Sequence, residues 1–453
     1  MNKKHIIMLI LMCTLIFFVK YHGFGSGNVS EIMPLTLRLE DSSYLENDWY
    51  VNASGNFNAR TNFASFTIAV NRIFNNYEIT YLVLAYLCFI IFAFGFYKLI
   101  FVLTKNENLS LFTTLLPLLI GSYGLGNSFI IGDYFNPGYI AWTHIIWGLY
   151  FFFDKKYWNA FIIIGLASFF QAMSAYMIAS VLTILLLYER NWKGSFATLG
   201  FYALFIMLNA RLILSELFTK SFLSSSQLNY ILADFRLSHH YFPSNPLLWI
   251  SFIGFFAIFC YAFYKSEIKE WERLKVLVVI ILSFVVISMF FSEVIHWGFI
   301  TKLRLIRALE LLCIIEFIFI GEFIWNNIKK LWAIPLLILI VVPCYIYTDV
   351  HFDNPIGRFE YEPKVAELYD WVKLNTPEDA IFLVPLELSS FRYGAERAVV
   401  VDWKMHTYKT NTIFDWYTRV YDVRTKGGLF LYYTYGVDYI VEESEGGYQI
   451  HEI

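Results

Sequence analysis

Residues 77–103 read YEITYLVLAYLCFIIFAFGFYKLIFVL, an apolar run of 27 residues in which Glu78 and Lys98 are the only charged side chains. A helix that crosses the hydrocarbon core of a bilayer needs about 20 mostly apolar residues. This stretch is therefore long enough to span a membrane with some tilt. It predicts that the chain is an integral membrane protein.

The composition of the whole chain supports this interpretation. Of its 453 residues, 58% are hydrophobic, 20% aromatic and only 16% charged, whereas soluble chains carry about 25% charged residues. The net charge of −3 and the lack of a basic stripe with interleaved aromatics disfavour nucleic acid as a partner. The five cysteines lie in apolar runs without C-x-x-C spacing, so neither a disulfide framework nor a zinc site is indicated.

Similar apolar runs recur along the chain and predict about 11 spans in all. Besides 77–103, the predicted spans are 5–20, 111–131, 138–153, 157–170, 174–188, 195–210, 247–264, 276–291, 304–325 and 331–348. Two short helices that turn near Gln171 are preferred to one long helix over 157–188, because they keep the basic pairs on one side of the membrane. The first run could pass for a secretory signal, but an uncleaved first span is favoured because many later spans depend on its orientation.

Basic residues give an independent indication of topology. If the N-terminus is inside, every predicted inside segment holds at least two basic residues, as cytoplasmic loops normally do. An odd number of spans then places the C-terminal part outside. The predicted fold class is an α-helical polytopic membrane protein. Its transmembrane domain covers 1–348, with long outer loops at 21–76 and 211–246, and a small extracytoplasmic α/β domain covers 349–453. Because the inner loops are short, function is expected on the outer face.

The C-terminal part carries patterns of a folded domain. Apolar residues recur at helical spacing over 365–372. The apolar segments 380–385 and 397–403 predict strands, and 412–420 predicts a helix. Residues 438–443 and 448–451, around Gly446-Gly447, predict a hairpin.

Acidic residues in the predicted outer loops are candidates for catalysis. Glu46 and Asp48 are two residues apart, and such carboxylates can hold a cation, orient an acceptor hydroxyl or remove its proton. The alternative is a solvated acidic loop with a helix-capping role. Asp133 lies in a short loop at the membrane surface, where an acid usually has a partner or a task. It could instead cap the helix that follows Pro137.

Basic residues in the outer segments are candidates for phosphate binding. Arg304 and Arg307 are three residues apart and would share one face of a helix at the outer end of a span. Guanidinium groups bind phosphate through paired donors, although both arginines could also reach lipid headgroups by snorkelling. His239 and His240 could bind metal, bind phosphate or transfer a proton. Neighbouring side chains on an extended segment point apart, which favours one functional histidine over a shared metal.

Asp402 and Lys404 lie at the end of a predicted strand of the C-terminal domain. Residues at strand ends often face a ligand, so both are candidates for contacts with an acceptor or a phosphate. A fold-supporting ion pair is the alternative.

Together these features resemble the GT-C superfamily of polytopic membrane glycosyltransferases, which use a polyprenyl-phosphate-linked sugar as donor. Residues 371–380, WVKLNTPEDA, also look like the start of the outer domain in bacterial relatives of this superfamily. The resemblance implies that Asp48 is the catalytic base with Glu46 assisting, and that Asp133 is the acid of the second loop. Arg304 and Arg307 would hold the phosphate of a lipid-linked donor in the bacterial plasma membrane. No Trp-Trp-Asp motif is present, since residues 402–404 match it only loosely. The acceptor and the need for a divalent metal ion stay open.

Two other classes of function remain. A transporter or flippase for a lipid-linked or polar substrate would use acidic residues within spans, and Glu310 and Glu316 fall in or near one. Many transporters show internal repeats, and the sequence shows none. A non-catalytic envelope assembly protein would use the C-terminal domain to bind a partner.

Overall fold

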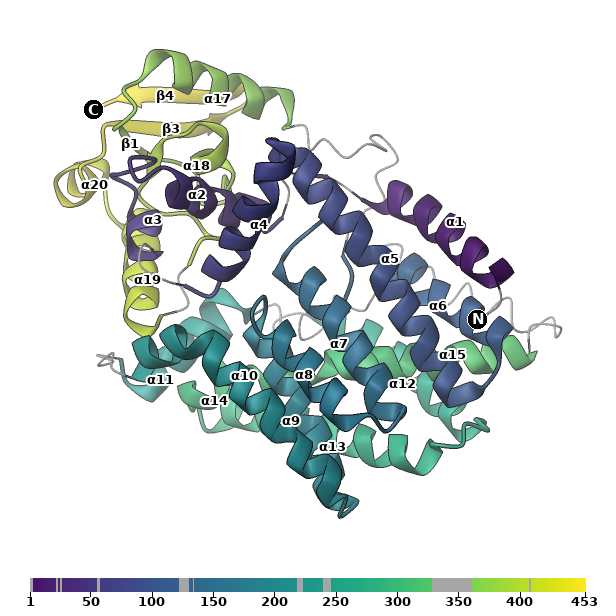
Figure 1. Ribbon diagram of the computed structural model, residues 1–453. Helices are drawn as coiled ribbons and strands as arrows, with labels where there is room; N and C mark the ends of the chain where they lie inside the picture. The colour runs from purple at the N-terminus through teal and green to yellow at the C-terminus, as the bar shows by residue number, and fades with distance from the viewer. Residues whose placement is uncertain are drawn as a thin grey trace.

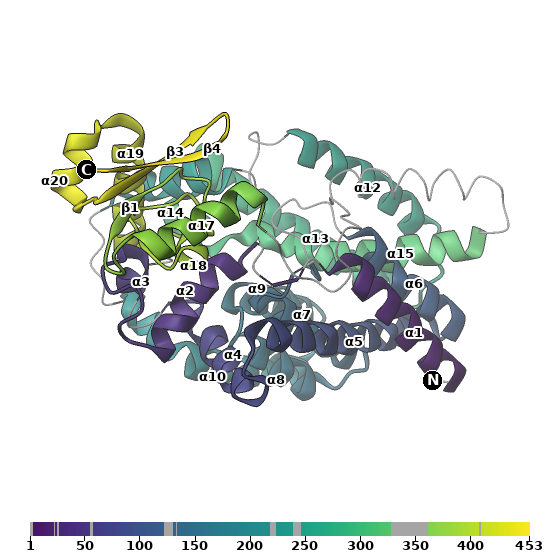
Figure 2. The same cartoon turned by 90° about the horizontal axis from the view of Figure 1, so that it is seen from above.

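The structure is a computed structural model, and its helical bundle carries a small mixed sheet domain at one end (Figure 1). Figure 2 shows the same arrangement from above, with the sheet domain at the end of the bundle away from the N-terminus. The residues that it describes are 3–21, 23–24, 27–54, 58–121, 130–132, 134–217, 223–238, 246–327, 361–406 and 409–453.

Long apolar helices build the bundle. They are α1 (Lys3–Lys20), α5 (Tyr77–Thr104), α6 (Glu107–Ile120), α7 (Pro137–Phe153), α8 (Tyr157–Ala167), α9 (Ala172–Tyr188), α10 (Trp192–Leu217), α12 (Pro246–Tyr264), α13 (Trp271–Met289) and α15 (Leu309–Asn327). Three of these helices begin at an asparagine cap. The side chains of Asn76, Asn106 and Asn136 accept hydrogen bonds from backbone N–H groups in the first turns of α5, α6 and α7. The turn between α8 and α9 confirms the prediction of two short helices over 157–188.

The predicted count of about 11 spans is supported in part. In the part of the chain that the structure describes, three helices are long and apolar enough to cross a membrane, over Tyr77–Thr104, Trp192–Ser215 and Trp271–Val294, and shorter apolar helices accompany them. The predicted span at 331–348 lies outside the described residues. The span predicted from residue 304 begins later as a helix, because Arg304 has a left-handed φ of 50° and a 3-10 turn, η5 (Leu305–Ala308), precedes α15.

The predicted outer loop at 21–76 is folded into helices. They are α2 (Val29–Glu40), α3 (Trp49–Ser54) and α4 (Thr61–Phe74), and they lie at the junction between the bundle and the sheet domain (Figure 1). The short elements α11 (Ser225–Asn229), η2 (Tyr230–Arg236), η4 (Phe290–Val294) and α14 (Gly298–Leu303) complete this junction.

The C-terminal domain has an α/β fold, as predicted. It contains α17 (Pro363–Asn375), β1 (Ile381–Leu383), α18 (Phe391–Gly394), β2 (Ala398–Val399), α19 (Thr410–Thr425), α20 (Gly428–Tyr435), β3 (Tyr439–Ser444) and β4 (Gly447–Glu452). The strand order is β2-β1-β3-β4, with β1 parallel to both neighbours and β3 antiparallel to β4, which confirms the hairpin. Strand β2 is shorter than predicted, because it ends at Val399 and the chain bends at Val400. The predicted domain boundary at 348 lies outside the described residues.

Candidate functional site

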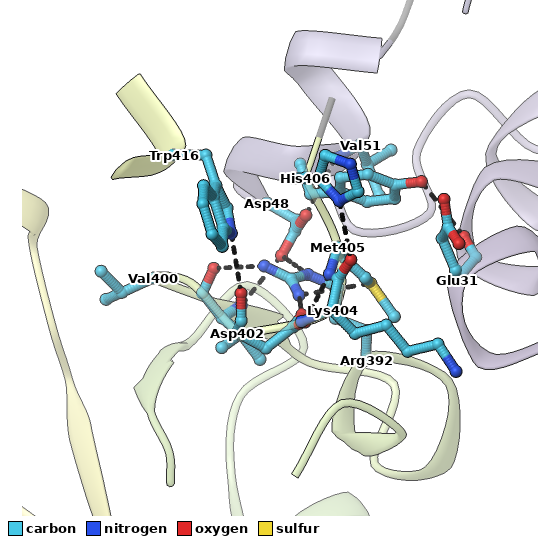
Figure 3. Close-up of polar contacts among 12 residues, drawn as sticks. Glu31, Asp48, Val51, Arg392, Val400, Asp402, Lys404, Met405, His406 and Trp416 are labelled. Atoms are coloured by element: carbon cyan, nitrogen blue, oxygen red, sulfur yellow. Dashed lines mark hydrogen bonds and ion pairs between the residues drawn. The ribbon is translucent and has the colours of Figure 1, made fainter. Parts of the chain in front are cut away.

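A buried ion network joins the first long loop to the C-terminal domain (Figure 3). The Asp48 side chain is fully buried and the Arg392 side chain is 1% exposed. Oδ2 of Asp48 accepts hydrogen bonds from Nε of Arg392 at 2.6 Å and from the backbone N–H of Val399 at 2.9 Å. Oδ1 accepts from the backbone N–H of Val51 at 2.9 Å, so Asp48 also caps the first turn of α3. Both oxygens of Asp48 are therefore occupied.

The same guanidinium binds a second carboxylate. Nη1 of Arg392 donates to Oδ2 of Asp402, and Nη2 donates to the carbonyl of Val399 at 3.0 Å. Oδ1 of Asp402 accepts from the backbone N–H groups of Lys404 at 2.8 Å and Met405 at 2.7 Å, a turn that aspartate favours because its short side chain reaches the backbone two residues on. Burial raises the pKa of Asp402, while the Arg392 charge and both N–H groups oppose that rise. The network thus holds the turn 402–406 in place.

Basic side chains from separate segments gather around this turn. The basic cluster comprises Arg60, Arg236, Arg304, Lys404 and His406. Nε of Arg236 donates to Nδ1 of His406 at 3.2 Å, and Nη2 of Arg236 donates to the carbonyl of Lys404 at 3.1 Å. Nζ of Lys404 donates to the carbonyl of Gly27 in the first long loop.

Arg304 is assigned to this cluster because its charge acts on His406. The pKa of His406 is lowered well below its usual value, first by burial and then by the charges of Arg236 and Arg304. Arg60 adds a smaller effect in the same direction. The His406 imidazole is therefore neutral near pH 7, and it can accept the hydrogen bond that Arg236 donates.

One carboxylate from the first long loop faces the cluster. Oε1 of Glu31, in the first turn of α2, lies 3.4 Å from Nε of Arg60. Burial lowers the pKa of Lys404, and the charge of Glu31 is the largest effect that opposes this drop. Glu31 thus contacts Arg60 and acts on Lys404, while Arg236 and Arg304 act on His406 in the same cluster. Such an excess of fixed positive charge is suited to binding an anion.

The structure separates the two arginines that the sequence paired. Arg304 lies near His406, as its effect on the pKa of that residue shows. Arg307 is buried instead in the bundle, where its Nε lies 2.8 Å and its Nη2 lies 2.5 Å from Oε1 of Glu310. The two side chains do not share a helix face because the left-handed backbone of Arg304 and the 3-10 turn break the helical spacing.

The remaining predicted site residues are not part of the ion network or the basic cluster as described. Glu46 is exposed, and its carbonyl accepts from Asn52 Nδ2 at 2.6 Å. Asp133, His239 and His240 lie outside the described residues. Tyr134, which follows Asp133 in the sequence, packs closely against Gly27. A Cβ added at Gly27 would lie 2.5 Å from the Tyr134 ring. Tyr134 therefore lies next to Gly27, whose carbonyl accepts a hydrogen bond from Lys404.

Metal binding has no support within the described part of the chain. No group of three or more histidine, cysteine, aspartate or glutamate side chains there could hold a metal ion. The neighbouring carboxylates of Asp48 and Asp402 both bind the Arg392 guanidinium.

Glu31 gave no signal in the sequence. It is an isolated acid in an amphipathic segment, without the short spacing that drew notice to Glu46 and Asp48. Arg60 and Arg236 stood near candidate motifs, but a single sequence does not show that these distant segments meet.

Comparison with known proteins supports the fold. Residues 363–423 match a domain of unknown function (DUF6798), and this match includes Arg392, Asp402, Lys404 and His406. No curated protein sequence matches the chain.

Among solved structures, the chain is similar to the oligosaccharyltransferase of Archaeoglobus fulgidus, in a crystal structure with a tethered acceptor peptide that contains the NVT sequon. The alignment covers 98% of this chain and 69% of that chain, with a TM-score of 0.54 and 10% sequence identity. At this identity the similarity is one of fold. The chain therefore shares the fold of that oligosaccharyltransferase.

Proposed function

We propose that the chain is a membrane glycosyltransferase that moves a sugar from a polyprenyl-phosphate-linked donor to an acceptor on the extracytoplasmic face of the bacterial plasma membrane. The observation that carries this proposal is the basic cluster. Arg60, Arg236, Arg304 and Lys404 come from separate segments and meet beside the first long loop. Positive charge fixed in a partly buried setting suits the phosphate of a leaving lipid.

The donor phosphate binds between Arg304 and the turn 402–406 in this proposal. Arg304 comes from the junction of α14 and η5, next to the bundle, while Lys404 comes from the C-terminal domain. A lipid-linked donor that enters from the bilayer would meet both. Arg307 was predicted for the same task, and it could reach the phosphate only by leaving Glu310.

The reaction is an inverting single displacement. The acceptor oxygen attacks the anomeric carbon, the bond to the phosphate oxygen breaks, and the electron pair stays on the phosphate. Fixed cations stabilise the charge that develops there. The sequence assigns the acceptor proton to Asp48, with Glu46 and Asp133 on the acceptor side. Since Asp48 accepts three hydrogen bonds, it could take a proton only after Arg392 moves away.

Phosphate binding can be tested without knowledge of the sugar. The full-length protein in detergent is heated with a polyprenyl phosphate or the matching polyprenol, because a ligand that binds the folded state raises the unfolding temperature. We expect the phosphate to stabilise the protein and the alcohol to have little effect. Arg304→Gln should weaken phosphate binding by about tenfold or more, since a hydrogen bond to a charged group contributes about 1.5–3 kcal/mol.

Lys373→Gln is the matched control, because Lys373 is an exposed cation that pairs with Glu396 away from the cluster. It should leave binding unchanged. Equal stabilisation by phosphate and alcohol, or full phosphate binding by Arg304→Gln, would contradict the proposal.

One observation favours transport as a second candidate function. The buried helix α15 carries Glu310, Glu316 and Glu322, which are 0%, 0% and 6% exposed. Ionisable groups inside a membrane domain are often part of a substrate or proton pathway. Counterflow of a labelled polar or lipid-linked substrate in proteoliposomes tests this candidate. Sugar transfer without counterflow would rule it out.

A further inference from the structure

We infer that Glu31 is the carboxylate that accepts the proton of the acceptor hydroxyl, and that Asp48 is a positioning residue. This inference rests on the proposed glycosyl transfer, and it adds a catalytic residue to that reaction. The geometry of the two carboxylates carries it. Glu31 lies against Arg60 of the basic cluster, whereas Asp48 is enclosed by the ion network (Figure 3).

Glu31 lies where the transferred sugar would sit. It is in contact with Arg60, and its charge acts more strongly on Lys404 than that of Asp402, which is only two residues from Lys404. A donor phosphate held by Lys404 and Arg304 would place the anomeric carbon within a bond or two of these cations. A carboxylate beside them is within reach of an oxygen that attacks that carbon.

Glu31 also has a free acceptor atom, in contrast to Asp48. Among the described residues, the Glu31 side chain accepts one hydrogen bond, from Arg60 to Oε1. Oε2 accepts none there. Both oxygens of Asp48 accept hydrogen bonds, one from Val51 and two from Arg392 and Val399. A hydroxyl that reaches this side chain, which is 4% exposed, can therefore donate to Oε2 without displacing an existing hydrogen bond.

The helix that carries Glu31 is firmly packed. Its neighbours Val29, Ile32 and Met33 are at most 1% exposed. The hydroxyl of Tyr50 donates to the carbonyl of Glu31 at 3.3 Å and ties α2 to α3. Catalytic groups need such fixed positions, because a small displacement from the reacting atoms lowers the rate strongly.

The step balances with the groups at hand. The acceptor oxygen forms a bond to the anomeric carbon while its hydrogen passes to Oε2 of Glu31. The bond between that carbon and the phosphate oxygen breaks, and both electrons leave with the phosphate. The products are the glycosylated acceptor, the polyprenyl phosphate and protonated Glu31, which returns its proton to water.

Asp48 acts on this step through Arg392. Asp48 and Asp402 hold the guanidinium from two sides, and Asp402 holds the backbone of Lys404. Loss of the Asp48 charge would loosen Arg392 and then the turn that presents Lys404 and His406. Asp48 thus sets the position of the cations without touching the substrate.

The experiment compares Glu31→Gln with Asp48→Asn in the full-length protein in proteoliposomes. Membrane-derived polyprenyl-phosphate sugars serve as donors, and released polyprenyl phosphate is measured together with kcat, KM, polyprenyl phosphate binding and the unfolding temperature. Glu31→Gln should lower kcat by about 100-fold or more, as expected for loss of a general base. Its phosphate binding and unfolding temperature should stay close to those of the wild type. Asp48→Asn should lose transfer and unfold at a lower temperature.

Glu31→Asp is a second variant that keeps the test informative if Glu31→Gln does not fold. It keeps the charge and shortens the side chain, so it should fold, bind polyprenyl phosphate and show a reduced kcat. Wild-type kcat in Glu31→Asp and Glu31→Gln would overturn the role of Glu31 and leave the proposed function intact. A wild-type protein that releases no polyprenyl phosphate from any donor would overturn both.

Discussion

Two groups of buried charge lie next to each other at the junction of the bundle and the C-terminal domain, and they are built differently. In the ion network, Arg392 stands between Asp48 and Asp402, and backbone N–H groups fill the remaining carboxylate positions. In the basic cluster, several cations gather at one place, and Glu31 contacts Arg60 and acts on Lys404. The first arrangement has two carboxylates that share one guanidinium, which suits a structural role. The second arrangement concentrates positive charge from separate segments, which suits the binding of an anion.

The same contrast separates two arginines three residues apart. Arg307 is matched by Glu310 inside the bundle, and its side chain is 7% exposed. The charge of Arg304, in contrast, lowers the pKa of His406 in the C-terminal domain. The difference teaches that the partner of a guanidinium, more than its spacing in the sequence, indicates whether it holds the fold or a ligand.

Arg392→Met is the most severe test of the structural role. It would leave Asp48 and Asp402 buried without their shared cation, and removal of one partner from a buried ion pair costs about 3–5 kcal/mol. Because two buried carboxylates lose their shared cation, we expect the free energy of unfolding to fall by an amount near the upper end of that range. The unfolding temperature in detergent and the yield of monodisperse protein measure it. Arg392→Lys keeps the charge and should lose less. A stable Arg392→Met protein would show that the network is not what joins the two parts.

Glu310→Leu tests the matched arginine of the bundle. It leaves a single buried charge, that of Arg307, without its partner. We therefore expect the free energy of unfolding to fall by an amount near the lower end of the same range, about 3 kcal/mol. The double variant Arg307→Met, Glu310→Leu should recover most of the stability, because neither buried charge remains. Thermal unfolding of both variants measures the difference. If the double variant is as unstable as Glu310→Leu, a further partner holds these side chains.

His406 tests the environment of the basic cluster through pH. Its pKa is lowered in the folded protein, first by burial and then by Arg236 and Arg304. Below about pH 6.5 the unfolded chain therefore binds a proton that the folded chain excludes, and stability falls as pH falls, by up to about 1.4 kcal/mol per pH unit. Unfolding temperatures from pH 7.5 to 5.5 measure this slope. His406→Asn should flatten it, whereas the exposed control His451→Asn should not. An unchanged slope in His406→Asn would place the responsible group elsewhere.

The sequence predicted the parts of the fold that depend on local patterns. Apolar length predicted most of the helices of the bundle, and period and turn residues predicted the hairpin at β3 and β4. Prediction from local patterns failed where the backbone departs from regular helical geometry. The left-handed conformation of Arg304 and the following 3-10 turn delay the start of α15, and nothing in the local composition marks such a turn.

The site was less accessible to sequence reasoning, because it is made by contacts over long separations. Asp48 and Asp402 were both chosen as candidates, but that they share Arg392 is a fact of tertiary packing. Glu31 carries no motif, and it becomes notable only when Arg60 and Lys404 are seen around it. Spacing rules find neighbours on one element. They do not find residues that meet from different domains.

The exposed pair Lys373 and Glu396 gives the smallest expected effect and sets the baseline for the comparison. Its side chains lie 2.8 Å apart but are 38% and 52% exposed. Water and salt screen such pairs, which typically contribute about 0–1 kcal/mol. Lys373→Ala should therefore shift the unfolding temperature little, and high salt should remove what shift there is. Because this bridge is within hydrogen-bonding distance, as is the 2.6 Å bridge between Arg392 and Asp48, a large loss of stability here would mean that distance alone sets the strength of an ion pair in this domain. A negligible loss, next to a large one for Arg392→Met, would mean that burial and complete hydrogen bonding are what make the network at the junction structural.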